Sequence, residues 1–142
     1  MAVKPKVSRR DYQMLAAFRY SLRQFLRFSE EAAHAVGMTP QQHQTLLAIK
    51  GFPERDFVTI GELAERLQLA HHSTVGLVDR LQRQNYLRRV QSEQDHRKVY
   101  VKLTAKGEKV LEQLSTGHCE QLRRISPQWK SLLKSLGGDL PD

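Results

Sequence analysis

One polar stretch, "HHSTVG" at 71–76, carries several residues whose side chains can recognise another molecule. His71, His72, Ser73 and Thr74 donate and accept hydrogen bonds, and Gly76 lets a partner come close to the backbone. Two cations follow at helical spacing, Arg80 and Arg83. Small polar groups next to cations suit contacts with base edges and phosphates. Taken alone, His71 and His72 fit exposed turn residues better than DNA contacts.

A second stretch, "QSEQDHRKVYVKLT" at 91–104, has a charged tip followed by a strict alternation of apolar and polar residues from 99 to 103. The tip contains Asp95, Arg97 and Lys98. An arginine at the end of a hairpin can enter the minor groove of DNA, where the negative potential is strong. We therefore expect Arg97 to enter the groove, and Asp95 to orient Arg97 or to brace the tip. The alternative is a surface ion pair, which contributes under about 1 kcal/mol.

Enzymatic and metal chemistry is not indicated. The 142 residues contain no Gly-rich phosphate loop, no nucleophile motif and no carboxylate pair in a recognisable setting. The single cysteine, Cys119, excludes a disulfide framework and a multi-thiolate zinc site within one chain. We expect no cofactor, no membrane span, no secretory signal, and a reduced cytoplasmic protein.

The positive charge is concentrated around the two polar stretches. Residues 66–106 contain 9 Lys and Arg against 3 Asp and Glu, whereas residues 1–65 contain 9 against 7 and residues 107–142 contain 5 against 5. A local basic surface attracts polyanions, above all nucleic acid. A basic face kept for solubility would give the same count.

Local signals predict the elements that position these residues. Apolar residues at helical spacing predict a helix over 11–36, ended by Gly37. "TPQQ" and "TIGE" each begin a helix with a threonine cap and a Gln or Glu that closes a capping box. A further helix runs from Ala70 until Asn85 ends it. The wide apolar surface of 12–36 needs cover from more than one side, which favours a partner subunit.

The second half of the chain is predicted to form a hairpin and a long helix. The strands are expected at 87–90 and 99–103, with a short strand at 57–59. Thr104 caps the last helix, Pro127 is expected to break it, and a short helix with Trp129 follows before a frayed tail at 137–142. The fold class is therefore mostly α with a small β-hairpin wing, a winged helix-turn-helix.

The sequence resembles the MarR family of regulators over roughly residues 36–115. The matching segments are "TPQQHQTLLAI", "TIGELAERLQL", "STVGLVDRLQRQNYLRR" and "DHRKVYVKLTAKG". The most specific element of the family pattern is an Asp-x-Arg tip followed by an alternating strand and Leu-Thr-x-x-Gly. In this sequence it is matched by Asp95, Arg97, Leu103, Thr104 and Gly107. The resemblance implies a single domain over 1–142, in which dimerisation helices at 10–36 and 108–137 flank a DNA-binding lobe at 38–107. It also implies a homodimer on pseudo-palindromic double-stranded DNA, and repression relieved by a small ligand, such as an aromatic compound bound between the lobe and these helices, or by an oxidant.

Several positions depart from the family pattern. Ala70 and His71 stand where a capping residue is common, which predicts weaker phosphate contacts or a shifted helix boundary. Cys119 lies late in the last helix, so we expect a small buried residue rather than a peroxide sensor. Zinc-sensing members resemble this chain around His43, but only His118 is present in the long helix. The other class that remains open is a winged-helix module that docks protein without specific DNA binding.

Overall fold

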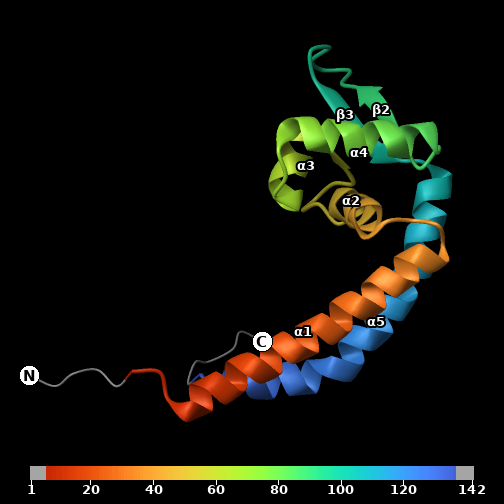
Figure 1. Cartoon of the computed structure of the whole chain (residues 1–142). Coiled ribbons are helices and arrows are strands. Elements are labelled where there is room, and N and C mark those ends of the chain that lie inside the picture. Colours follow the sequence, from red (N-terminus) through yellow and green to blue (C-terminus); the bar gives the residue numbers. More distant parts are fainter. Residues whose placement is uncertain (1–5, 137–142) are drawn as a thin grey trace, which may run out of the picture. The chain divides into compact units, whose positions relative to one another are not determined.

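The computed structural model describes residues 6–136, which form two compact units. The lobe spans Glu30–Ser115, and the helical unit combines the described residues up to Ser29 with those from Thr116 onward. Two long helices, α1 (Arg9–Ala35) and α5 (Ala105–Lys134), each run through both units (Figure 1). The predicted tail at 137–142 lies outside the described residues.

The two capping boxes begin the first short helices of the lobe as predicted. In α2 (Pro40–Lys50) the Thr39 hydroxyl accepts from the Gln42 amide at 3.1 Å, and the Gln42 side chain accepts from the Thr39 amide. In α3 (Ile60–Leu67) the same exchange joins Thr59 and Glu62. Each box satisfies amides that have no partner inside the helix, so both helix starts are set by local sequence.

The hairpin prediction is confirmed, and the sheet has one further strand. After α4 (His71–Arg83), strand β2 (Leu87–Gln91) pairs antiparallel with β3 (Val99–Leu103). Strand β1 (Phe57–Val58) pairs with the other edge of β3, which gives the order β1-β3-β2. Asn85, with φ of 65°, takes the left-handed conformation expected between α4 and β2.

The core of the lobe lies between these elements and extends into both long helices. Leu46, Leu63, Val78 and Val101 are buried at its centre. The flanking members of the same cluster are Ala33 from α1 and Val110, Leu111 and Leu114 from α5. The compact lobe is therefore longer than the 38–107 segment expected from the sequence, because apolar residues outside that segment complete its core.

A close backbone approach explains Gly107. A Cβ atom there would lie 2.2 Å from the Tyr86 carbonyl oxygen, a distance that real contacts do not allow. The same oxygen accepts from the Thr104 amide at 3.0 Å, and the Thr104 hydroxyl donates to the Asn85 carbonyl at 2.5 Å. The Gly107 amide donates to the Thr104 hydroxyl at 3.1 Å, so Thr104 begins α5 as predicted.

The expected break at Pro127 is wrong, since α5 continues through it to Lys134. Proline removes the hydrogen bond to the carbonyl four residues earlier, which is that of Arg123. The Ser126 hydroxyl donates to this carbonyl at 3.2 Å instead. Beyond the proline, the indole of Trp129 packs on Phe18 and donates to the Ser21 hydroxyl at 2.6 Å. These contacts hold the last turns of α5 against α1.

The outer face of α1 carries large apolar side chains that the single chain does not cover. The most exposed of them are Tyr12 at 63%, Leu15 at 50%, Tyr20 at 61% and Leu26 at 53%. On α5, Leu122 and Leu133 are also exposed. No helix among the described residues is long and apolar enough to cross a membrane.

Candidate nucleic-acid interface

Helix α4 has one buried face and one polar outer face. Leu77, Val78 and Leu81 are buried in the lobe. The exposed side chains are His71, His72, Ser73, Arg80, Gln82 and Arg83, with Gly76 half-exposed among them. This outer face therefore carries most of the α4 residues that the sequence analysis assigned to DNA contact.

Thr74 is a correction to that assignment. Its side chain is fully buried, and its hydroxyl donates to the Ala70 carbonyl at 3.0 Å. A threonine hydroxyl inside a helix commonly donates to the carbonyl four residues earlier, which turns the hydroxyl toward the helix backbone. The Thr74 side chain therefore belongs to the interior of the lobe and is not available to read a base.

A hollow of about 330 Å³ lies beside the outer face of α4. Its walls come from α2, the turn before α4 and α4 itself, namely Gln41, Leu69, His72, Ser73, Gly76, Leu77 and Arg80. A Cβ atom built on Gly76 would meet nothing within 4 Å. Gln41 is exposed and was missed by the sequence analysis, because only the fold brings the start of α2 beside α4.

The start of α4 has no side-chain cap. Ala70 occupies the N-cap with extended backbone, and its methyl group offers no acceptor to the amides of the first turn. The helix boundary is not shifted, since α4 begins at His71. The first-turn amides therefore have no capping acceptor from Ala70, and they lie next to exposed His71 and His72.

The wing tip is organised around Asp95. Its carboxylate accepts from the Arg97 amide at 3.1 Å and lies 3.3 Å from the Arg97 Nε, while its carbonyl accepts from the Lys98 amide at 2.9 Å. The Asp95 amide donates to the Ser92 hydroxyl at 3.3 Å. The Arg97 side chain is 93% exposed. Asp95 thus shapes the turn, and the Arg97 guanidinium extends from it into solvent.

Arg89 joins the wing to α4, and the sequence analysis did not find this residue. From β2 its guanidinium donates to the Asp79 carboxylate at 2.8 Å and to the Gln82 side chain at 2.5 Å. Both partners lie on α4. The distance between α4 and the wing is thereby fixed by a charged contact as well as by apolar packing. The sequence predicted a strand at 87–90 but gave no sign of this partner.

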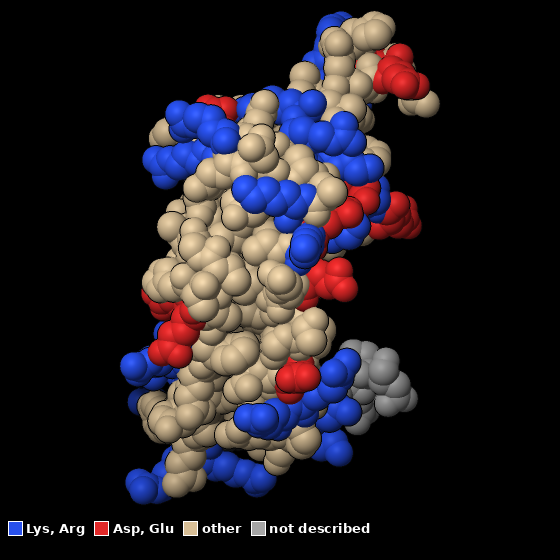
Figure 2. Space-filling view, turned by 90° about the vertical axis from the view of Figure 1, so that its right-hand side faces the viewer, with Lys and Arg blue, Asp and Glu red and all other residues tan. Residues whose placement is uncertain are grey.

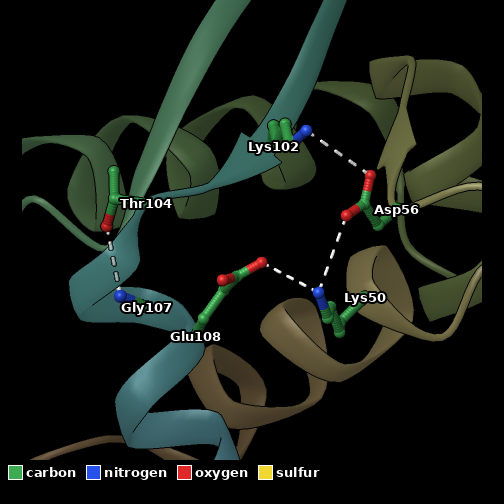
Figure 3. A network of polar contacts seen from close by, with 6 residues as sticks. All are labelled: Lys50, Asp56, Lys102, Thr104, Gly107 and Glu108. Carbon is green, nitrogen blue, oxygen red and sulfur yellow. Dashed lines mark hydrogen bonds and ion pairs between the residues drawn. The ribbon is translucent and has the colours of Figure 1, made fainter.

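A polar network joins β3, α2 and the start of α5 behind the wing (Figure 3). The Lys50 ammonium lies 2.8 Å from the Glu108 carboxylate and 3.6 Å from that of Asp56, and Asp56 also lies 3.6 Å from Lys102. The hydrogen bond with Glu108 raises the pKa of Lys50 above its ordinary value, and the charges of Glu108 and then Asp56 add to it against the opposing effect of burial. Lys50 and Lys102 are thus partly neutralised, unlike Arg80 and Arg83 of α4, which make no ion pair in the described part of the chain.

Lys and Arg side chains gather near the base of the wing in the view of Figure 2. The exposed cations of α4 and β2 include Arg80, Arg83 and Arg88. None of these three makes an ion pair within the part of the chain that the structure describes. An exposed and uncompensated basic surface attracts a polyanion.

Cys119, His118 and His43, the residues considered for peroxide or zinc sensing, do not belong to this surface. Cys119 is exposed, so the expectation of a small buried residue is wrong for the single chain. The His118 ring packs edge-on against Phe25 and Phe28, and its Nε2 lies 2.8 Å from the Ser29 hydroxyl. His43 is buried in the lobe. Within the described residues, no three His, Cys, Asp or Glu side chains gather as a metal site would require.

Three helices, of which the last presents a polar face, followed by the β2–β3 hairpin to which β1 adds a third strand, define a winged helix-turn-helix protein. Residues 36–98 match the model described as the MarR family. The resemblance drawn from the sequence is thus confirmed over residues 36–98, which are similar to the MarR family. All of residues 36–98 lie within the lobe.

Two sequence relatives come from Bacillus subtilis (strain 168). The chain is 31% identical over 93 residues to the uncharacterized HTH-type transcriptional regulator YsmB, an alignment that covers 66% of this chain and 62% of YsmB. It is 33% identical over 75 residues to the uncharacterized HTH-type transcriptional regulator YfiV, covering 50% of this chain and 47% of YfiV. The matches therefore span less than two thirds of either relative.

Solved structures share the fold at low identity. AbsC, a MarR family transcriptional regulator from Streptomyces coelicolor, has a TM-score of 0.71 at 19% identity and covers 94% of this chain and 93% of its own. A MarR family protein from Bacillus stearothermophilus has a TM-score of 0.73 at 23% identity, with 89% and 91% covered. A variant of Staphylococcus aureus MepR bound to an oligodeoxyribonucleotide has a TM-score of 0.66 at 21% identity, with 85% and 93% covered. These relatives and structures are regulators or MarR family proteins by name, and no enzyme is among them.

Proposed function

We propose that this chain is a sequence-specific DNA-binding transcriptional regulator. The observation that carries the proposal is the combination, within one compact lobe, of the polar outer face of α4 and the exposed Arg97 at the wing tip. A helix such as α4 enters the major groove, where base edges are read, and a wing reaches the neighbouring minor groove. The MepR variant bound to an oligodeoxyribonucleotide supports this role by analogy of fold.

Within this proposal the contacts divide by type. Ser73, His72 and the open space above Gly76 face the base edges, while His71, Arg80 and Arg83 hold phosphates. Arg97 enters the minor groove, with Asp95 shaping the tip and Lys98 on the adjacent backbone. A single chain presents one such surface, so a pseudo-palindromic operator needs two chains.

The proposed dimer uses the long helices. Tyr12, Leu15, Tyr20 and Leu26 on α1 are too apolar and too numerous to remain exposed on a soluble monomer. Covering them with the same helices of a second chain forms a symmetric interface. The regulator then acts in the cytoplasm as a repressor that a small aromatic ligand releases from DNA. A dimer can hold its two lobes at a spacing that does not fit both half-sites of the operator. A ligand that binds this form of the dimer more tightly lowers the affinity for the operator.

Selection of bound fragments from the source genome, followed by anisotropy titration, tests this function. We expect one recurrent pseudo-palindromic sequence, bound with a steep loss of affinity as salt rises. Sedimentation at micromolar concentration should give about twice the 16.4 kDa of the chain. A protein-docking module, the alternative function, would instead show no recurrent sequence and only weak binding to generic duplex DNA.

A further inference from the structure

A row of cations and aromatic rings runs from α3 to the wing along the segment that joins α2 to β1. The Arg66 guanidinium of α3 lies 5.0 Å from the centroid of the Phe52 ring, and the Arg55 guanidinium lies 4.6 Å from the same centroid. Arg55 also lies 5.3 Å from the centroid of the Phe57 ring in β1. The Phe57 ring meets Tyr100 of β3 edge to face, with centroids 4.8 Å apart and planes at 68°. The row therefore connects α3, β1 and β3 within the lobe.

Arg55 is the centre of this row. Its guanidinium lies over the Phe52 and Phe57 rings. It also pairs with the Glu62 carboxylate of α3, which accepts from the Thr59 amide at the start of that helix. A planar guanidinium can place its face on a ring while its edge donates to a carboxylate, whereas an ammonium group lacks this geometry. The Arg55 side chain is only 28% exposed, so these contacts are partly shielded from solvent.

The segment before β1 needs contacts from outside to keep its conformation. Glu54 has a φ of 67°, a left-handed backbone conformation that residues other than glycine rarely adopt. β1 itself has only two residues, which pair with two residues of β3. A strand of this length adds few hydrogen bonds to a sheet. Side chains must therefore help to hold β1 against β3, and Arg55 joins the rings on both sides of Glu54 to α3.

We propose that Arg55 is a positioning residue that directs the wing toward DNA. Arg55 holds β1, the Phe57 ring of β1 packs on β3, and β3 follows the tip that carries Arg97. Because the sheet order is β1-β3-β2, Arg55 acts at one edge of the wing sheet while Arg89 joins the other edge to α4. Arg55 is engaged by its own rings and carboxylate and acts through the wing. The inference rests on the proposed function, and it concerns the direction of the wing rather than the choice of DNA as partner.

A cycle of variants of the full chain, titrated with the selected operator, tests this role. Arg55→Gln should weaken binding at least about threefold, the scale on which contacting residues are coupled. In the Arg97→Ala background the same substitution should have a smaller effect, because the contact that it positions is already lost. Arg55→Lys should not restore the affinity of the parent, since an ammonium group keeps the charge but not the planar contacts. Lys109→Gln, which removes an exposed cation of the lobe outside the row, is the matched control and should stay within about twofold of the parent, as surface substitutions usually do.

The wing is followed without DNA through the backbone amide signals in NMR spectra, where Arg55→Gln should shift the signals of Tyr100 and Arg97. Phe57→Leu is the second variant, because it keeps an apolar residue in β1 while removing the ring between Arg55 and Tyr100, and it should show the same coupling to Arg97→Ala. Circular dichroism checks that each variant is folded.

The inference is overturned if folded Arg55→Gln binds the operator like the parent, or if its effect is equally large with and without Arg97. It is also overturned if Arg55→Lys binds like the parent, which would make Arg55 a phosphate contact. A parent that binds no DNA would overturn the proposed function, whereas amide signals of Tyr100 and Arg97 that do not change in Arg55→Gln would overturn this inference alone.

Discussion

Arg89 on the wing and Asp79 on α4 form an ion pair, with the guanidinium nitrogen 2.8 Å from the carboxylate oxygen. The two residues belong to the two elements that the proposed function places in neighbouring grooves. Their contact therefore connects the geometry of the lobe to the spacing of its DNA contacts. An exposed pair contributes little to folding, about 0.2–1 kcal/mol, so its main effect is expected on position rather than on stability.

The first prediction follows from this pair. Arg89→Asp should weaken operator binding, because the wing loses its charged contact with α4 and meets a like charge at Asp79. The exchanged double variant, Asp79→Arg with Arg89→Asp, should recover part of the affinity, since the pair is restored in reverse. Anisotropy titration with the selected operator measures both. If Arg89 acted only as a phosphate contact, the double variant would bind no better than Arg89→Asp alone.

Gly76 gives a prediction in which stability and binding move in opposite directions. Gly76→Ala should raise the free energy of unfolding by about 0.5–1 kcal/mol, because a glycine inside a helix is costly and the added methyl group meets nothing. The same methyl group should weaken operator binding, since it fills the space left for a close partner. Gly117→Ala on α5 is the control for stability without a change in binding. Unchanged operator affinity in Gly76→Ala would place the DNA surface elsewhere.

Gly107, in the first turn of α5, gives the opposite prediction for the free energy of unfolding. Gly107→Ala should lower the free energy of unfolding by about 1–3 kcal/mol, because its Cβ atom would lie 2.2 Å from the Tyr86 oxygen and force the backbone apart. At Gly117, on the same helix, an added Cβ would meet Phe28 at an ordinary 3.5 Å. Urea unfolding of the two variants makes the comparison. Equal effects at the two positions would show that the approach to Tyr86 is not tight.

Glu62 makes the stability of the lobe dependent on pH. Burial acts to raise the pKa of Glu62, but the hydrogen bonds with Thr59 and the charge of Arg55, which pairs with Glu62, outweigh it and lower the pKa below its ordinary value. A carboxylate with a lowered folded pKa stabilises the fold above its unfolded pKa, near 4.3, and that contribution is lost as pH falls through the folded value.

The free energy of unfolding should therefore fall less steeply below about pH 5 in Glu62→Gln than in the parent. Glutamine keeps the capping bond, as Gln42 does at the start of α2, so the variant isolates the charge. Urea unfolding at several pH values measures the difference, with Glu65→Gln as the control on the same helix. Parallel curves for Glu62→Gln and the parent would contradict the lowered pKa.

Features set by neighbouring residues were predictable from the sequence, and features set by the fold were not. The caps at Thr39, Thr59 and Thr104 depend on residues three positions away, and all three were predicted correctly. The break expected at Pro127 was wrong because the Ser126 hydroxyl takes the carbonyl that proline leaves free. Thr74 was misplaced because its polar type indicated exposure, whereas its hydroxyl is satisfied within its own helix.

The tertiary part of the site could not be read from the sequence. Gln41 enters the hollow beside α4 only because α2 lies there, and Arg89 meets Asp79 only because β2 returns beside α4. The pairing of β1 with β3 likewise joins residues far apart in the chain. The polar outer face of α4 and the charged wing tip were predictable, because each is a short run of residues whose types can be recognised without knowing the tertiary fold.

The last prediction concerns the wing tip. Arg97→Ala should weaken operator binding by roughly 1–3 kcal/mol per half-site, the range of one specific contact. It should also flatten the dependence of log affinity on log salt by about one unit per subunit, because one fewer counterion is released. Asp95→Ala should weaken binding less, since it loosens the turn that directs Arg97 but leaves the cation in place.

The effects of the two substitutions should not add, because Asp95 and Arg97 lie in contact and act on the DNA as one unit. Substitution of Ser73 should instead change which sequences are preferred, since it faces the major groove where the base code is read. Circular dichroism establishes first that each variant is folded, and Arg124→Ala controls for the loss of one positive charge outside the lobe. A folded Arg97→Ala that binds the operator as tightly as the parent, with the same salt dependence, would show that the exposed guanidinium remains in solvent and that α4 alone holds the DNA.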